Sequence, residues 1–161
     1  MSAQNEIKPG LVVIGMQHAA FHAGDAAADF AVRRTCSLID RARRDGVQIV
    51  FIQQTRGHGP LAYGGQGWRL IDLVQPCFPD WVVQASEADI FAHTNLCAQL
   101  RAIGINRLVF AGLDADSVEV SCQSAMELGF EAALAAGDQA SEDAFMALAG
   151  RPAGADTLSF A

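Results

Sequence analysis

Apolar and polar residues follow one another along the chain in a pattern that predicts alternating strands and helices. Short apolar runs predict five strands, at Leu11–Ile14, Val47–Ile52, Trp81–Val83, Arg107–Ala111 and Phe130–Ala135. Amphipathic segments that end at glycine or before Asp-Gly predict helices at Asp25–Arg44, Asn95–Ile103 and Ser117–Leu128. A further helix is expected at Glu142–Leu148, and a last strand at Thr157–Phe160.

This alternation indicates a three-layer α/β fold. Strands joined by helices favour right-handed crossovers and a mostly parallel sheet of five to six strands with helices on both faces. No repeat or linker interrupts the pattern, so residues 1–161 are expected to form a single domain. The functional crevice of such a sheet lies at the carboxyl ends of its strands. The segments that follow the strands there are Gly15–Asp25, Gln53–Trp68, Gln84–Phe91 and Gly112–Ser117.

Composition and charge exclude several classes of protein. Of 161 residues, 51% are hydrophobic and 18% are charged, which predicts a well-filled core. A formal net charge of −7 and the lack of a basic run argue against a nucleic-acid or anionic-membrane partner. No stretch reaches the roughly 18 apolar residues that a membrane span needs. Because the first residues do not resemble a secretory signal, a cytoplasmic protein is expected.

Two residue types restrict the chemistry. Lys8 is the only lysine, and it precedes the first predicted strand, at the opposite end of the sheet from the crevice. The cysteines are spaced far apart, without a CxxC pair, and are expected to be reduced and mostly buried. They are Cys36, Cys77, Cys97 and Cys122. No cofactor is predicted.

Four separated motifs resemble the isochorismatase-like cysteine hydrolases, a superfamily that includes the nicotinamidases. The motifs are LVVIGMQHAAF, PLAYGGQGWRLIDLVQP, VVQASEADIFAHTNL and LVFAGLDADSVEVSCQSAMELGF. They occur in the order of the family and cover about residues 10–140. The resemblance implies a Rossmann-like fold and a hydrolase with three working residues. These are a cysteine nucleophile, an aspartate after the first strand that takes its proton, and a lysine after the third strand that stabilises charge.

The chain departs from the family at all three positions. Carried over residue by residue, the aspartate falls on Gly15, the lysine on Ala85 and the cysteine on Ser117. The segment Gly112–Ser117 is also one residue shorter than in the family. A lysine left without its partners in a dry pocket would cost several kcal/mol, so the joint replacement is electrostatically consistent. The resemblance therefore predicts a member that has lost the cysteine-hydrolase chemistry and binds a small molecule or a partner protein.

A hydrolase of amide-like C–N bonds with altered machinery is the alternative. Ser117 would be its nucleophile, at a helix N-terminus where backbone N–H groups can hold an oxyanion. The competing interpretation is that Asp116 caps the helix, Glu119 completes a capping box and Ser117 is simply the first helical residue. Cys122 lies five residues further along the helix and is expected to be a core thiol.

Three histidines are candidate metal ligands for the same alternative. His18 and His22 would share one face if their loop were helical. His58 follows the second strand, in a loop that lacks the aspartate which metal-binding nicotinamidases have there. The sequence favours the interpretation of all three as polar residues at the rim of the pocket, and no metal is predicted.

The expected pocket combines the three altered positions with residues of the neighbouring loops. Its predicted lining is Gly15, Phe21, His58, Trp68, Ala85, Asp114 and Ser117. Asp114 and Asp116 bring negative charge to the mouth of the pocket, which disfavours anionic ligands. The expected exposure of Trp81 and of the alanine-rich segment Ala132–Ala147 predicts a homo-oligomer.

Overall fold

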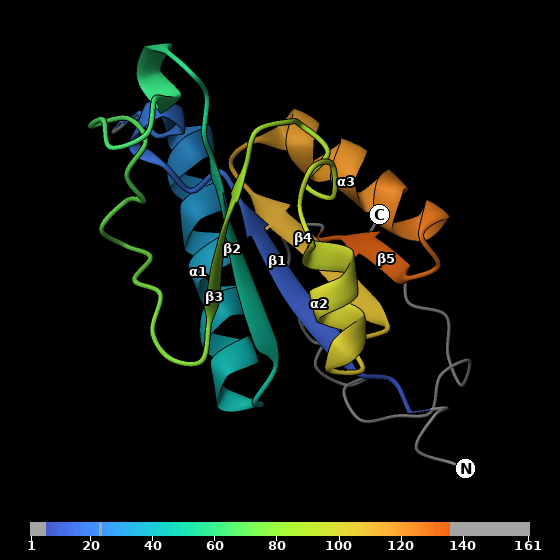
Figure 1. Cartoon of the computed structure of the whole chain (residues 1–161). Helices are drawn as coiled ribbons and strands as arrows, with labels where there is room; N and C mark the ends of the chain where they lie inside the picture. The colour runs from blue at the N-terminus through green and yellow to red at the C-terminus, as the bar shows by residue number, and fades with distance from the viewer. Residues whose placement is uncertain (1–5, 23, 136–161) are drawn as a thin grey trace.

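The computed structural model describes residues 6–22 and 24–135 of the chain. They form one sheet with the strand order β3-β2-β1-β4-β5, in which every neighbouring pair is parallel. The strands are β1 (Pro9–Ile14), β2 (Gln48–Gln54), β3 (Trp81–Ala85), β4 (Arg107–Gly112) and β5 (Glu131–Leu134). The predicted parallel α/β fold is confirmed, and β1 is the central strand of its sheet (Figure 1). The helix and strand expected at Glu142–Leu148 and Thr157–Phe160 lie outside the described residues.

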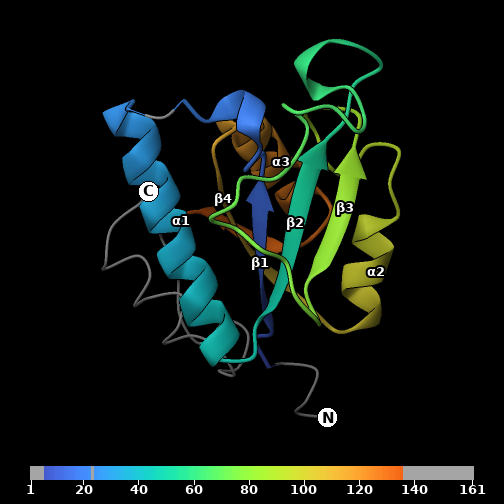
Figure 2. The ribbon, with the colours of Figure 1, turned by 90° about the vertical axis from the view of Figure 1, so that its left-hand side faces the viewer.

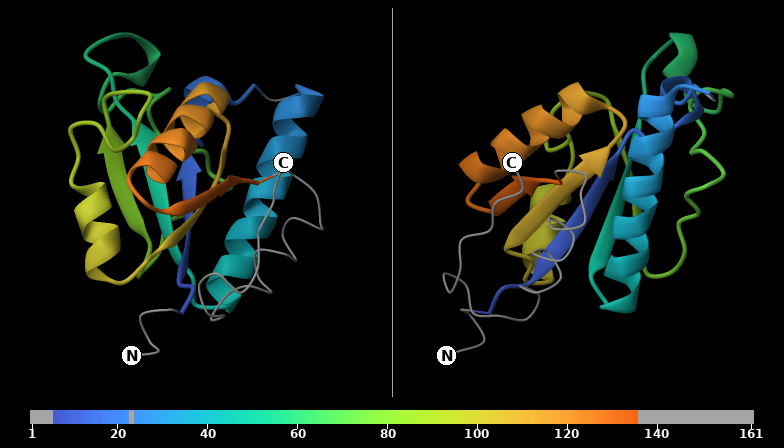
Figure 3. Two further views of the ribbon diagram at one scale, coloured as in Figure 1. Left: turned by 90° about the vertical axis from the view of Figure 1, so that its right-hand side faces the viewer. Right: turned by 180° about the vertical axis from the view of Figure 1, so that it is seen from behind.

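Helices cover both faces of the sheet (Figure 3). They are α1 (Ala26–Arg44), α2 (Leu96–Ala102) and α3 (Ala115–Glu127). Leu11 and Val13 of β1 belong to the core beneath α1, whereas Val12 and Ile14 belong to the core beneath α2 and α3. Because β1 is buried on both faces, its residues form a continuous apolar run. No helix within the described residues is long and apolar enough to cross a membrane.

Helix α3 begins two residues earlier than the sequence pattern predicts. The predicted cap, Asp116, lies in the first turn, and the residue at the N-cap is Asp114. The Oδ1 atom of Asp114 accepts a hydrogen bond from the backbone N–H of Ser117 at 3.2 Å. An N-cap side chain accepts a hydrogen bond from the backbone N–H group two or three residues further along the chain. The carboxylate of Asp114 makes this bond to the first turn of α3, and that of Asp116 does not. Ser117 is therefore the third residue of the helix instead of the first, and it is buried.

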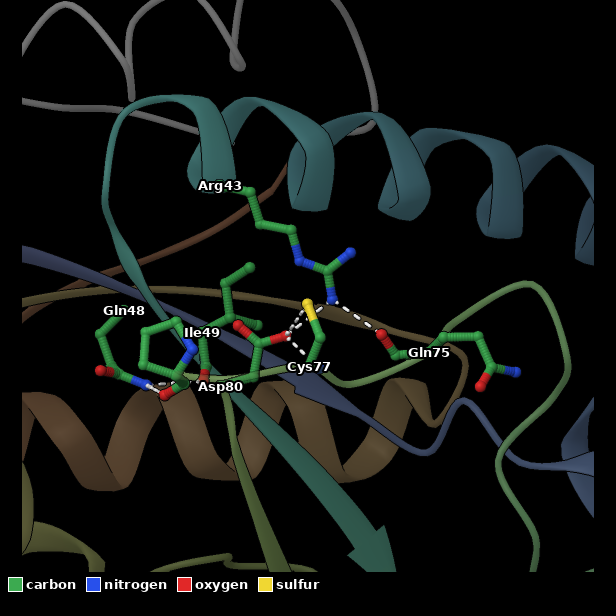
Figure 4. Close-up of polar contacts among 7 residues, drawn as sticks. Arg43, Gln48, Ile49, Gln75, Cys77 and Asp80 are labelled. Carbon is green, nitrogen blue, oxygen red and sulfur yellow. Dashed lines mark hydrogen bonds and ion pairs between the residues drawn. The ribbon is translucent and has the colours of Figure 1, made fainter.

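An ion pair fastens the connection between β2 and β3 to the end of α1 (Figure 4). The Nη2 atom of Arg43 lies 2.7 Å from the Oδ2 atom of Asp80, and it also donates to the carbonyl of Gln75 at 3.0 Å. The same Asp80 oxygen accepts from the backbone N–H of Cys77 at 3.1 Å. These bonds hold the chain at the amino edge of the sheet just before β3 begins.

The cysteines are less buried than the sequence predicts. All four are free, but only Cys122 is buried, Cys36 and Cys97 are half-buried, and Cys77 is exposed. Burial raises the pKa of the Cys122 and Cys36 thiols, which disfavours their reactive thiolate forms. Cys122 packs into the core beneath α2 and α3, as expected for its place on α3.

Candidate functional site

The three positions that the resemblance assigns to catalytic residues lie at the carboxyl edge of the sheet, at or after the ends of β1, β3 and β4. The strands of the sheet end together at this edge (Figure 2). Gly15 follows β1, and its N–H donates to the carbonyl of Ile52 at 3.1 Å. Ala85 ends β3 and is in register with Gln54 of β2. The Nε2 atom of Gln54 donates to the Oγ atom of Ser117 at 2.9 Å. The end of β2 therefore links the three positions.

A pocket of about 330 Å³ opens at this edge. Its lining comes from the segment after β1, the end of β2, the 3-10 helix that follows β2, and the chain from the end of β4 to the start of α3. The described residues that line it are Gly15, Gln17, Ala19, Ala20, Gln54, Leu61, Leu113, Asp114, Ala115 and Asp116. Of the lining expected from the sequence, this set contains Gly15 and Asp114. The other expected residues, placed below, are Ala85, Ser117, Phe21, His58 and Trp68.

Gly15 has no room for a side chain. Its φ of +75° lies in the region that favours glycine, and a Cβ atom added there would lie 2.7 Å from the Cβ atom of Asp114. The neighbouring strand also approaches closely, because a Cβ atom on Gly112 would lie 2.0 Å from the carbonyl oxygen of Ile14. The Asp114 side chain thus fills the space that a side chain at residue 15 would need.

Ser117 is 1% exposed, and neighbouring groups bind its hydroxyl group on both sides. The hydroxyl accepts from Gln54 and donates to the carbonyl of Ala88 at 2.5 Å. Ser121, one turn further along α3, donates to the same carbonyl at 3.1 Å and accepts from the N–H of Ile90. In this arrangement, the two serines fasten α3 to the connection that follows β3.

Replacing Ser117 by alanine is expected to lower the free energy of unfolding by about 1–2 kcal/mol, because the buried amide of Gln54 loses its acceptor. Urea unfolding measures the change. Ser124→Ala is the matched control, since Ser124 lies on the same helix and its hydroxyl bonds to no described residue. Equal effects of the two substitutions would contradict a structural role for the Ser117 hydroxyl.

Arg56 brings a positive charge next to Ala85, and the sequence analysis did not single it out. Its Nη1 atom donates to the Oε1 atom of Gln54 at 2.9 Å and to the carbonyls of Thr55 and Ala85 at 3.2 and 3.4 Å. The guanidinium group therefore joins the ends of β2 and β3. The sequence shows that Arg56 directly follows a predicted strand, which would have made it a candidate site residue. Which residues it bonds to depends on the register between β2 and β3, which the sequence does not show.

Gln17 is a second residue that the sequence analysis missed. Its side chain is buried, and its Nε2 atom donates to the carbonyls of Gln54 and Trp68 at 2.9 and 2.8 Å. Its Oε1 atom accepts from the N–H of Gln54 at 2.9 Å. The amide groups of Gln17 and Gln54 are thus both engaged within the protein, although both residues line the pocket.

The aromatic residues and Ala85 have structural contacts outside the pocket lining. Phe21 packs against the core beneath α1, and Ala85 lies in the core on the opposite face. The indole N–H of Trp68 donates to the Thr55 hydroxyl at 3.0 Å. The ring of Trp68 lies 4.7 Å from that of Tyr63, centroid to centroid.

A metal site formed by His18 and His22 would require their loop to be an α-helix, and the structure does not show one there. His18 begins a short 3-10 helix that ends at Ala20, and Phe21 is extended, so His18 and His22 do not lie on one α-helical face. His58 is exposed at the start of a second 3-10 helix. Within residues 6–22 and 24–135, no group of three or more His, Cys, Asp or Glu residues is placed to hold a metal ion.

Comparisons with known proteins place these observations in a family. Residues 9–147 match the Isochorismatase domain. A streptothricin hydrolase from Streptomyces noursei is 35% identical over 129 residues, which cover 77% of this chain and 46% of that protein. A ureidoacrylate amidohydrolase from Acinetobacter baylyi is 39% identical over 70 residues, or 44% of this chain and 27% of that protein.

A solved structure agrees over nearly the whole chain. N-carbamoylsarcosine amidase from Thermoplasma acidophilum has a TM-score of 0.75 and 25% identity, and the match covers 94% of this chain and 99% of that one. The chain spans less than half of the length of the two curated relatives. Because the family match extends over most of the sequence and the fold agrees, the resemblance is confirmed: the chain belongs to the isochorismatase family, among relatives that are hydrolases.

Proposed function

We propose that this chain is a small-molecule-binding member of the isochorismatase family that has lost the cysteine-hydrolase reaction. The observation that carries the proposal is the state of Ser117, at the position assigned to the nucleophile. A nucleophile must reach the substrate and needs a base to take its proton. The Ser117 hydroxyl is buried, and its hydrogen is directed to the carbonyl of Ala88. The pocket beside it is open and lacks a cysteine among its described lining.

The chemistry of the pocket favours a neutral or cationic ligand. Ala19, Ala20, Leu61 and Leu113 supply apolar surface, and the described lining contains no lysine, arginine or histidine. Asp116 is exposed and forms no hydrogen bond or ion pair with a described residue. Arg56 bonds to the lining residue Gln54 but is not itself part of the described lining, whereas Asp114 and Asp116 are. The charge nearest to a ligand is therefore negative, which favours cations over anions. Small apolar molecules that carry an amine fit this description.

An amide hydrolase with altered machinery is the second candidate, and the names of two relatives, a streptothricin hydrolase and a ureidoacrylate amidohydrolase, favour it. For Ser117 to act as its nucleophile, the hydroxyl would have to leave both Gln54 and Ala88 and turn toward the pocket. Buried hydrogen-bonded groups resist such a change, since each broken bond leaves an unsatisfied partner.

A thermal-shift screen with matched neutral, cationic and anionic small molecules tests the binding proposal. A ligand at a hundred times its dissociation constant is expected to add about 2.7 kcal/mol of stability. Asp116→Asn should raise the dissociation constant of a cationic ligand by roughly tenfold, because it removes about one favourable charge interaction. It should leave a neutral ligand unchanged.

Asp40→Asn is the matched control for this screen, since Asp40 is an exposed aspartate on α1, outside the pocket lining. Selective binding of anions, or equal effects of the two substitutions on a cationic ligand, would contradict the assignment of ligand charge. A screen in which no class of molecule shifts the unfolding temperature would contradict small-molecule binding itself.

A further inference from the structure

We propose that Asp114 determines which ligand the pocket takes, and that its carboxylate binds the ammonium group of a small primary amine directly. This inference rests on the proposed function, and it names the class of ligand and the side chain that holds it. Both Asp114 and Asp116 line the pocket, but Asp114 is half-buried beside Gly15, whereas Asp116 is exposed. The contact with the ligand is therefore assigned to Asp114.

The side chain of Asp114 lies where a side chain of residue 15 would lie. A Cβ atom added to Gly15 would be 2.7 Å from the Cβ atom of Asp114 and 3.3 Å from its backbone nitrogen. The glycine after β1 thus leaves room for a side chain from the segment after β4. Because of this exchange, the chain keeps a carboxylate at the carboxyl edge of the sheet, supplied by a different segment.

The carboxylate of Asp114 has unused capacity to accept hydrogen bonds. Its Oδ1 atom accepts from the backbone N–H of Ser117 at 3.2 Å. No described residue donates to its Oδ2 atom or forms an ion pair with it. A carboxylate offers about four acceptor positions, and one without a counter-charge loses hydration as it becomes buried. A cationic ligand that donates to Oδ2 would offset this cost.

The other polar side chains inside the pocket are occupied. The amide groups of Gln17 and Gln54 are engaged in hydrogen bonds within the protein. Water screens the charge of the exposed Asp116 more strongly than that of the half-buried Asp114. An ammonium group in the pocket therefore finds its strongest partner at Asp114.

The size and lining of the pocket restrict the rest of the ligand. A volume of about 330 Å³ is near the lower end of the range for small-molecule sites. The apolar lining residues can contact a short carbon skeleton while the ammonium group meets Asp114. A primary ammonium group supplies N–H donors as well as positive charge. An alcohol of the same skeleton lacks the charge, and a carboxylate meets a like charge, so we expect the amine to bind best and the carboxylate worst.

Isothermal titration calorimetry of the full chain with benzylamine, benzyl alcohol and benzoate tests this order. Asp114→Asn removes the charge but keeps an N-cap residue as effective as aspartate, so α3 should still begin at the same place. It is expected to raise the dissociation constant of benzylamine by about thirtyfold or more, since a charge-assisted hydrogen bond is lost. The affinity for benzyl alcohol should change by no more than about twofold, because its binding uses no charge interaction.

Asp25→Asn is the matched control. Asp25 is the N-cap of α1, accepts from the N–H of Ala27 at 3.0 Å and does not belong to the described lining. Equal effects of the two substitutions on benzylamine would overturn the inference, and so would equal losses of benzylamine and benzyl alcohol in Asp114→Asn. Wild-type protein that binds benzyl alcohol but not benzylamine would overturn it and leave the proposed binding function standing. Binding of none of the three probes would overturn it as well, whereas the proposed function fails only if the broader thermal-shift screen is also negative.

Moving the carboxylate from residue 114 to residue 15 tests whether the two positions share one place. Asp114→Gly should weaken benzylamine binding as Asp114→Asn does. Adding Gly15→Asp to it should recover about tenfold of the affinity, since aspartate tolerates a positive φ better than most residues and its carboxylate enters the vacated space. A folded double variant that binds benzylamine no better than Asp114→Gly would overturn the shared place. The asparagine variants decide the inference if the double variant does not fold.

Discussion

The purified protein is expected to hydrolyse nicotinamide, isochorismate and simple amides no faster than the uncatalysed reaction. A cysteine hydrolase needs a thiolate, a base and a stabilising positive charge, and the matching positions carry Ser117, Gly15 and Ala85. Loss of a complete nucleophilic apparatus typically lowers turnover by about a factor of 10⁶. The measurement is product formation over hours at high protein concentration, against a heat-denatured sample.

Treatment with a thiol-alkylating reagent tests whether a cysteine at another position of the chain has taken over the role of the nucleophile. The result should not change when all four thiols are alkylated, since none of them lines the pocket and burial raises the pKa of Cys122. Amide hydrolysis that disappears in Ser117→Ala but persists in Ser124→Ala would contradict the proposed loss of catalysis. It would establish the serine-dependent hydrolase in its place.

Gly15→Ala is expected to lower the free energy of unfolding by about 2–5 kcal/mol, and Asp114→Gly should relieve part of that loss. The positive φ of +75° disfavours an L-residue by roughly 1–2 kcal/mol. The added Cβ atom, 2.7 Å from that of Asp114, contributes overpacking of about 1–3 kcal/mol. Urea unfolding of the two single variants and the double variant gives the interaction between the sites.

Gly46→Ala provides the control for backbone conformation. Gly46 has a φ of +70°, but a Cβ atom there would meet nothing within 4 Å. In the Asp114→Gly background, the cost of Gly15→Ala should therefore fall to about that of Gly46→Ala. An unchanged cost would mean that the two side chains do not compete.

This competition also bears on attempts to rebuild the family site. The triple replacement Gly15→Asp, Ala85→Lys and Ser117→Cys would restore the three residue types. It would also force a new side chain against Asp114. A rebuilt site therefore needs a change at residue 114 as well.

The sequence by itself determined the fold and the family. Apolar runs such as Leu11–Ile14, buried on both faces, and helix ends such as Asp25 and Gly46 are local signals, so the order of strands and helices could be predicted closely. The parallel sheet followed from that order, because crossover connections have one preferred hand. The placement of Gly15, Ala85 and Ser117 at or after the carboxyl ends of the first, third and fourth strands also followed from motif spacing.

Only the tertiary structure decided which side chains meet at the carboxyl edge. The contact of Gln54 with Ser117 joins residues 63 positions apart and depends on strand register and on where α3 begins. The same register brings Arg56 to Ala85, and the early start of α3 turns Ser117 inward while Asp114 meets Gly15. Local periodicity contains no information on such distances, because a shift of one residue in a cap or a register changes every partner.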